Sequence, residues 1–113
     1  MSAGPELGAR NMRWIEIIPV DTIPLREGRK VRLANLELAL FNLGGKYLAV
    51  ANSCPHKGGP LSDGILSGNS VFCPLHNWKV SLLDGCVENP PGQTCRIKTY
   101  PTKVEDKKVF LGL

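Results

Sequence analysis

Glycine and proline interrupt this chain of 113 residues at short intervals, and that spacing limits what the chain can fold into. The 12 glycines and 9 prolines leave no run with the sustained 3.6-residue periodicity of an amphipathic helix. The apolar residues lie instead in short or alternating runs, as they do in strands. The sequence therefore predicts an all-β domain, either a sandwich or a barrel. The predicted strands are residues 13–18, 30–33, 36–43, 46–52, 70–73, 78–83, 95–100 and 108–113.

Turn signals separate these runs and divide the chain. Residues 1–12 show no strand pattern and are expected to form a flexible N-terminal tail. Residues 13–113 are long enough for one small domain with its own core and too short for a second domain of ordinary size. The strongest hairpin signals are Gly44-Gly45, Asp84-Gly85 and Glu105-Asp106.

Charge and hydropathy argue against two classes of partner. The 14 lysines and arginines outnumber the 10 acidic residues, but they are scattered, and the densest basic cluster spans only residues 29–32. A nucleic-acid-binding stripe is not expected, and the basic excess suits a solvated surface or a face that docks on an acidic partner protein. The apolar run at 14–20 is interrupted by Glu16 and Pro19, and no run approaches the roughly 18 apolar residues of a membrane span. We expect a soluble, cytoplasmic protein.

Both histidines and half of the four cysteines lie in two similar stretches, 54–59 (CPHKGG) and 73–78 (CPLHNW). Taken singly, a cysteine is more often a small buried hydrophobe, and a histidine a satisfied polar residue, than a metal ligand. Here each histidine follows a cysteine by two or three residues, where a predicted strand gives way to a loop. Such loops present ligands while the strands stay rigid. The joint pattern predicts a metal centre, since cysteines in a cytosolic chain are more often ligands or buried thiols than a disulfide framework.

Two kinds of centre accept these donors. A tetrahedral zinc site binds two cysteines and two histidines, but zinc-finger sequences pair cysteine with cysteine and histidine with histidine along the chain. Here each loop supplies one ligand of each kind. A [2Fe–2S] cluster with two cysteines on one iron and two histidines on the other needs this interleaving, because each loop must reach both irons. The spacing therefore favours a cluster over zinc, with Cys54 and Cys73 on one iron and His56 and His76 on the other.

Cys-x-His, sixteen residues and then Cys-x-x-His resembles the signature of Rieske iron–sulfur proteins, and the resemblance runs from about residue 13 to the C-terminus. It implies an antiparallel β-sandwich with a small cluster-binding subdomain, one [2Fe–2S] cluster per chain, and cluster-binding loops within about residues 52–93. The extended motifs at 54–64 (CPHKGGPLSDG) and 73–85 (CPLHNWKVSLLDG) look most similar to the small subunit of the assimilatory NAD(P)H-dependent nitrite reductase. They look somewhat less similar to the ferredoxin components of ring-hydroxylating dioxygenases.

Three functions remain open, of which the resemblance implies two. The first is electron transfer as the small subunit of nitrite reductase, whose large subunit reduces nitrite to ammonium. The second is a ferredoxin that carries electrons from a flavin reductase to a terminal oxygenase. The third is a zinc-stabilised interaction module without redox activity. The chain offers no nucleophile–base pair, no Gly-x-Gly-x-x-Gly motif and no further histidine for a mononuclear iron, so we expect an electron-transfer subunit without a catalytic site of its own.

The resemblance also implies a second layer of residues around the cluster. Two glycines would let backbone amides approach the sulfides, a leucine and a proline-rich loop would exclude water, and a lysine would steer an acidic partner. Each feature also has an ordinary interpretation as a plain turn, a rigid connection, core packing or a solvated charge. The residues concerned are Lys57, Gly58, Gly59, Leu75, Trp78, Pro90 and Pro91.

Cys86 and Cys95 lie outside the two ligand loops and flank residues 89–93 (NPPGQ). A disulfide across this segment would need Cα atoms within about 7 Å of each other. The reducing compartment argues against that bond. We therefore expect two structural thiols that do not bind the metal centre.

Overall fold

The computed structural model describes residues 13–54, 59–75 and 78–113. The predicted tail lies outside the described residues, as do four of the predicted site residues, His56, Lys57, Gly58 and His76. The described part consists of strands, turns and one short 3₁₀ helix, η1 (Leu61–Asp63). No helix in this part is long and apolar enough to cross a bilayer. The strands are β1 (Trp14–Pro19), β2 (Gly28–Leu33), β3 (Leu36–Asn42), β4 (Tyr47–Ala51), β5 (Ile65–Ser67), β6 (Ser70–Phe72), β7 (Lys79–Ser81), β8 (Val87–Asn89), β9 (Thr99–Tyr100), β10 (Thr102–Glu105) and β11 (Lys108–Gly112).

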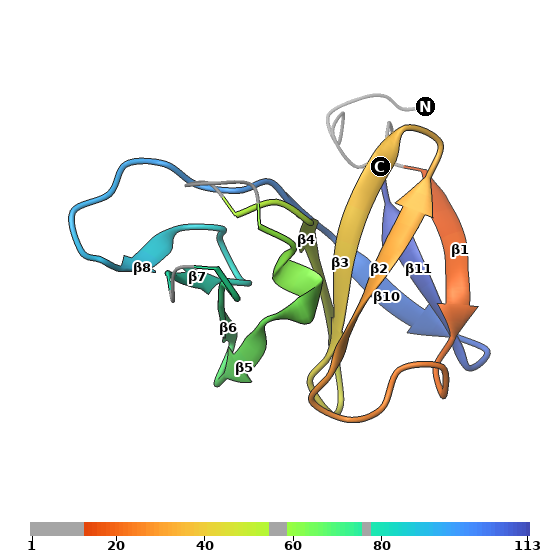
Figure 1. Cartoon of the computed structure of the whole chain (residues 1–113). Coiled ribbons are helices and arrows are strands. Elements are labelled where there is room, and N and C mark those ends of the chain that lie inside the picture. Colours follow the sequence, from red (N-terminus) through yellow and green to blue (C-terminus); the bar gives the residue numbers. More distant parts are fainter. Residues whose placement is uncertain (1–12, 55–58, 76–77) are drawn as a thin grey trace.

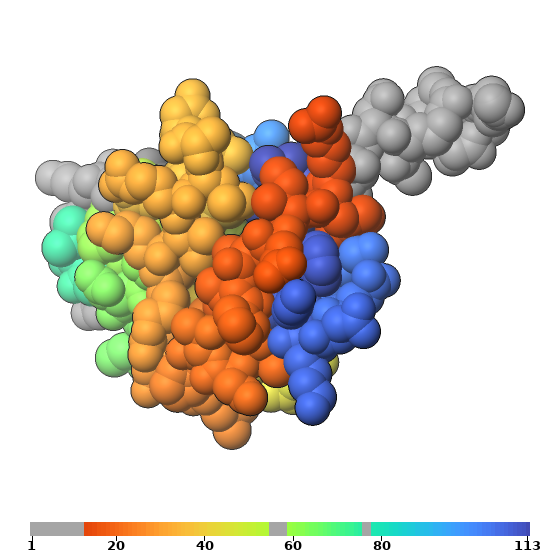
Figure 2. All heavy atoms as spheres, turned by 90° about the vertical axis from the view of Figure 1, so that its right-hand side faces the viewer, coloured from red at the N-terminus to blue at the C-terminus, as the bar shows by residue number. Residues whose placement is uncertain are grey.

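The described strands pair into three antiparallel sheets (Figure 1). The sheet β1-β11-β10 packs against the sheet β2-β3-β4-β9 to form a sandwich. The third sheet, β5-β6-β7-β8, lies to one side of the sandwich in Figure 1 and, together with η1, is called the subdomain below. Figure 2 shows residues of β1 and of the C-terminal strands side by side on one face of the sandwich.

Strand β3 explains why the molecule has two cores. The residues from Leu38 to Phe41 are all buried, so the central part of this strand has no solvent face. Because successive side chains of a strand point to opposite faces, Leu38 and Leu40 pack into the sandwich, whereas Ala39 and Phe41 pack against the subdomain. A strand that is buried on both faces gives a continuous apolar run rather than an alternating one.

The two cores consist of different buried residues. The sandwich core contains Ile23, Leu38, Leu40, Tyr47, Ala49, Val109 and Leu111. The subdomain core contains Ala39, Phe41, Val50, Cys54, Leu61, Val71, Cys73, Val80, Leu82, Val87 and Ile97. Both predicted ligand cysteines therefore belong to the second core. The predicted antiparallel sandwich with a small additional subdomain is confirmed.

Most predicted strands are confirmed, and the exceptions are short. The run 78–83 pairs only at β7, because a turn begins at Leu82. The run 95–100 contains only β9 and an isolated bridge between Cys86 and Arg96. The sequence does not predict β5, β8 or η1. Each has three residues, which is too short for a period of two or 3.6 to show.

The predicted turns are also confirmed. Gly44, Gly45 and Gly85 have φ angles of +77°, +125° and +80°, which favour glycine. In the last hairpin the two turn residues are Asp106 and Lys107, with φ angles of +51° and +62°. They lie one residue later in the chain than the predicted pair, and two successive positive φ angles are typical of a two-residue hairpin turn.

Candidate metal centre

The first predicted ligand, Cys54, lies just after β4 and is buried, with 2% of its surface exposed. Its backbone amide donates a hydrogen bond of 2.8 Å to the carbonyl of Gly59, five residues further along the chain. This bond closes a tight loop. His56 is in that loop by sequence, although it lies outside the described residues.

The second predicted ligand, Cys73, has the same local structure. It follows β6 directly, is fully buried, and donates a backbone hydrogen bond of 2.7 Å to the carbonyl of Trp78, again five residues further on. His76 is within this loop by sequence and also lies outside the described residues. The two loops are therefore built alike, with a buried cysteine at the start of each and a histidine inside each.

Gly59 brings the two loops into contact. A Cβ atom added to Gly59 would lie 2.9 Å from Cγ and Cδ1 of Leu75 and 3.0 Å from Sγ of Cys73. Ordinary carbon contacts are longer than this, so a side chain at residue 59 would push the loops apart. Glycine is required here for close approach rather than for an unusual φ angle. Gly58 lies outside the described residues, and that the amides of the two glycines approach the cluster sulfides stays a prediction.

The donor chemistry fits an iron–sulfur cluster. Two thiols lie in one apolar core at the start of adjoining loops, and buried thiolates are the donors such clusters use. Among the described residues, no three of His, Cys, Asp and Glu are grouped to bind a metal. The remaining two donors would have to come from His56 and His76, and their role as ligands stays a prediction.

The other predicted residues that the structure describes lie at different depths. Trp78 is half-buried and packs against the subdomain core, whereas Leu75 is 56% exposed at the outer side of its loop. Pro90 is half-buried and Pro91 is exposed, in the segment that follows β8. That Pro90 and Pro91 cover the cluster stays a prediction.

The two remaining cysteines stand apart from the ligand loops. In the described part of the chain, Cys86 and Cys95 do not form a disulfide with each other, and that they are structural thiols stays a prediction. Cys86 forms an antiparallel bridge with Arg96. Cys95 precedes Arg96 and is exposed, whereas Cys86 is half-buried.

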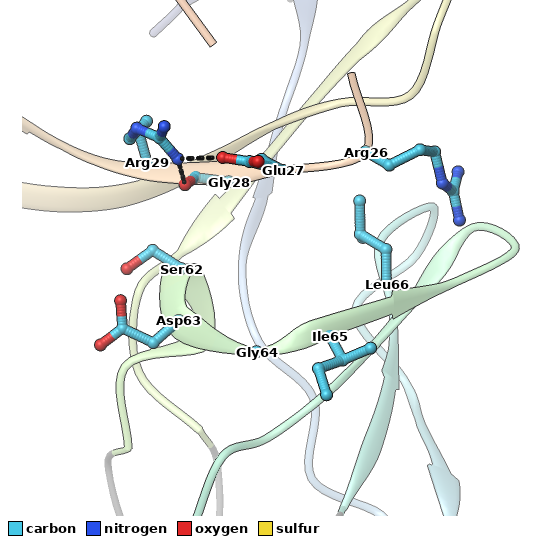
Figure 3. A pocket seen from close by; sticks show the side chains of 9 residues that line it. All are labelled: Arg26, Glu27, Gly28, Arg29, Ser62, Asp63, Gly64, Ile65 and Leu66. Carbon is cyan, nitrogen blue, oxygen red and sulfur yellow. Dashed lines mark hydrogen bonds and ion pairs between the residues drawn. The ribbon is translucent and has the colours of Figure 1, made fainter. Parts of the chain in front are cut away.

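A shallow groove separates the start of β2 from η1 and β5 (Figure 3). Both arginines that line the groove are bonded to other residues of the chain. Arg29 forms an ion pair of 3.0 Å with Glu27 and donates to the carbonyl of Gly28, and Arg26 donates to the carbonyl of Gly68. These bonds tie the arginines to neighbouring backbone and side chain, so we place the functional site at the ligand loops.

Sequence reasoning did not single out Asn52, a buried residue two positions before Cys54. Its side chain accepts a hydrogen bond from the amide of Ser62 and donates one to Glu37. The only available signal in the sequence was a polar residue at the end of an apolar run, which is common at strand ends. Its role depends on contacts between residues far apart in the chain.

Comparison with known proteins identifies the family. The Rieske [2Fe-2S] domain family matches residues 13–101. The ferredoxin component of the naphthalene 1,2-dioxygenase system of Pseudomonas aeruginosa is 35% identical over 101 residues, covering 89% of this chain and 96% of that protein. A solved ferredoxin from Sphingomonas yanoikuyae B1 matches with a TM-score of 0.79 and 27% identity, covering 89% of this chain and 99% of that one.

A further solved structure shows a shared fold alone. It is a protein from Mycobacterium tuberculosis assigned as the small subunit of an NADH-dependent nitrite reductase. It matches with a TM-score of 0.80 and 24% identity, covering 90% of this chain and 96% of that one.

The family match spans both ligand loops and most of both cores. The two buried thiols stand where the motif requires sulfur donors. The protein therefore belongs to the Rieske [2Fe-2S] family and binds a single [2Fe–2S] cluster.

Proposed function

We propose that this chain is the ferredoxin component of a ring-hydroxylating dioxygenase system, with Cys54, His56, Cys73 and His76 as the cluster ligands. The observation that carries the proposal is the extent of the sequence match. Relatives named as ferredoxin components of dioxygenase systems are 32–36% identical to this chain and match 92–97% of their own length. Overall sequence similarity thus favours the second of the two functions that the ligand motifs suggested.

In this proposal the two ligand loops carry the cluster, and burial of the two cysteines keeps water away from their sulfur atoms. A cluster of this type accepts one electron and passes it on. The chain contributes two buried thiols, a backbone contact at Gly59 and an apolar core behind them. The chain has two histidines, and the proposal uses both as ligands, so none is left for a mononuclear iron site within this sequence.

The outer face of the subdomain offers a docking surface beside the second ligand loop. Ile65, Phe72 and Lys79 lie opposite one another on β5, β6 and β7, so their side chains share one face. Ile65 is largely exposed, and the ammonium group of Lys79 lies 5.6 Å from the centre of the Phe72 ring. These residues form a partly apolar surface that carries a cation, and Lys79 also lies 3.9 Å from a carboxylate oxygen of Glu88. Such a surface suits transient contact with a partner that carries an acidic rim.

Ligation is tested by low-temperature EPR of the anaerobically purified, dithionite-reduced protein, with iron and sulfide analysis. We expect two irons per chain and a rhombic signal whose average g lies below that of all-cysteine clusters. Cys73→Ser and His76→Ala should abolish the signal, whereas the matched controls Cys86→Ser and Cys95→Ser should retain it. A colourless protein with bound zinc would contradict the ligand assignment.

The partner is tested by exchange of components. The reductase and oxygenase of a naphthalene 1,2-dioxygenase system are assayed for naphthalene-dependent NADH oxidation, with this chain in place of their ferredoxin. We expect turnover well above the assay without ferredoxin. The same protein is added to the large subunit of an NADH-dependent nitrite reductase, where we expect no stimulation of nitrite reduction.

The small subunit of a nitrite reductase is the second candidate. This candidate is supported by the extended ligand motifs at 54–64 and 73–85. The match to the solved structure from Mycobacterium tuberculosis adds no support, because at 24% identity it indicates a shared fold alone. Stimulation of nitrite reduction, without support of the oxygenase, would overturn the proposal in favour of this candidate. Stimulation of neither, by protein that holds its cluster, would contradict both partner assignments.

A further inference from the structure

The neck of a ligand loop is the place where the segments before and after the loop meet. The necks of the two loops are closed in different ways. The second loop is a β-hairpin: Phe72 and Lys79 pair across its base on β6 and β7. The first loop leaves β4, whose strand partners in the described part are β3 and β9, and continues into η1. Strand pairing therefore does not close the first neck, although the inner bond from Cys54 to Gly59 has the same form as the bond from Cys73 to Trp78.

A side chain closes the first neck instead. Oδ1 of Asn52 accepts a hydrogen bond of 2.7 Å from the backbone amide of Ser62. Asn52 is 6% exposed and Ser62 is 8% exposed, so water does not replace this bond easily. The bond joins the residue two positions before Cys54 to the first turn of η1, and so it spans the whole ligand loop.

Helix η1 needs an acceptor from elsewhere in the chain. The first amides of a helix have no partner within the helix. Pro60 stands at the cap position, where it makes no side-chain hydrogen bond, and its carbonyl accepts from Asp63. Asn52 supplies the acceptor for Ser62, and loss of that acceptor would leave a buried amide unsatisfied.

The other end of the Asn52 side chain is fixed to the sandwich. Its Nδ2 donates a hydrogen bond of 3.1 Å to Oε2 of Glu37, and its backbone amide donates to the Glu37 carbonyl. Oε1 of Glu37 accepts from Arg32 at 3.1 Å. The chain of polar contacts from Arg32 through Glu37 and Asn52 to Ser62, called the polar clamp below, thus connects the β2–β3 hairpin to the subdomain.

We propose that Asn52 is a positioning residue for the cluster: it holds the first ligand loop at a fixed place relative to the sandwich and to the second loop. Residues that orient ligands without touching the metal typically alter its affinity by about 10- to 100-fold when they are removed. The proposal rests on the cluster ligation given above and does not depend on which redox partner is used.

The first test compares Asn52→Ala with a matched control, Asn42→Ala. The Asn42 side chain likewise donates one hydrogen bond, to the backbone carbonyl of Ile23 at 2.8 Å, and accepts one, from the backbone amide of Gly44 at 2.9 Å, but these contacts lie in the sandwich. Each variant therefore loses one donated and one accepted side-chain hydrogen bond. We expect Asn52→Ala to release its cluster to a chelator about tenfold faster or more than wild type, and to change the g values of the EPR signal. Asn42→Ala should keep both within about twofold of wild type.

The second test exchanges the amide and the carboxylate of the clamp. Asn52→Asp alone keeps an acceptor for Ser62 but places a carboxylate against that of Glu37, and like charges at this distance repel. The double variant Asn52→Asp with Glu37→Gln restores a donor–acceptor pair with the polarity reversed. We expect fast cluster release in the single variant and recovery to within about threefold of wild type in the double variant.

Hydrogen exchange gives a readout that does not depend on the cluster. The Ser62 amide should lose protection in Asn52→Ala and keep it in the double variant, in apoprotein as well as in loaded protein. If Asn52→Ala and Asn42→Ala release cluster at the same rate, or if the double variant is no better than Asn52→Asp, the positioning role is wrong. Wild-type protein that binds no iron would overturn the proposed function itself, a result distinct from either of these.

Discussion

At the scale of single residues, a close contact between the two ligand loops depends on the absence of a side chain at Gly59. The loops meet where Gly59 packs against Leu75 and Sγ of Cys73. Leu75 is exposed and can move, but Cys73 is fully buried and its sulfur is fixed by the core around it. One added methyl group therefore tests how closely the loops approach.

We expect Gly59→Ala to destabilise the loaded protein by about 1–3 kcal/mol, the usual effect of overpacking a close contact. Thermal unfolding and iron content measure it. The double variant Gly59→Ala with Leu75→Ala should recover only part of the loss, because the contact with the Cys73 sulfur remains. Leu75→Ala alone serves as the control. Wild-type stability and iron content in Gly59→Ala would mean that the loops lie further apart than described.

At the scale of elements, the turn between β7 and β8 is fixed by a carboxylate. Oδ1 of Asp84 accepts a hydrogen bond of 2.9 Å from the amide of Cys86. This bond, with smaller contributions from Ser81 and the positive charge of Arg96, lowers the pKa of Asp84 below its ordinary value. The ionised form therefore stabilises the folded turn.

The pH dependence has a definite sign. Because the pKa of Asp84 is lower in the folded than in the unfolded protein, its contribution to the free energy of unfolding is present above the ordinary aspartate pKa of about 4. It is lost as the pH falls below that value towards the lowered pKa. Asp84→Asn keeps a neutral acceptor for Cys86 and removes the charge. We expect the stability difference between wild type and Asp84→Asn, measured by denaturant unfolding, to shrink as the pH falls from about 5. A difference that stays constant with pH would show that the charge has no role in the turn.

At the scale of the whole molecule, the sandwich and the subdomain are stabilised differently. Among the residues that the structure describes, the sandwich core contains none from η1 or from β5–β8, and neither Cys54 nor Cys73. The subdomain core contains the sulfur donors themselves, and its strands have only three residues each. Loss of the cluster should therefore weaken one core far more than the other.

Removal of the cluster tests this difference. In apoprotein, amide hydrogen exchange should remain slow at Leu40 and Leu111, whose side chains lie in the sandwich core. Exchange should become much faster at Val71 and Val80, on the two strands that flank the second ligand loop. Nuclear magnetic resonance of the apo and loaded forms gives both sets of rates. Equal loss of protection at all four residues would mean that the two cores unfold as one unit.

Most of the site was predictable because its signals are local. Two cysteines and two histidines at interleaved spacing are predicted as ligands from their chemistry and their distance along the chain, and the structure buries both cysteines at the starts of the two loops. The turns at 44–45 and 84–85 are likewise short-range features, since a φ angle depends on one residue. The continuous apolar run of β3 already carried the information that this strand is covered on both sides.

Tertiary structure decided the features that join distant residues. The contact between Gly59 and Leu75 and the bond between Asn52 and Ser62 link segments 16 and 10 residues apart. Strands β5 and β8, which have three residues each, exist because their partners and the core behind them hold them extended. Residue types and their spacing along the chain were enough to predict which cluster the chain binds, because ligand chemistry depends on these two properties. Only the folded chain decided how the ligand loops are held, because a hydrogen bond or a close contact depends on where two distant segments meet in space.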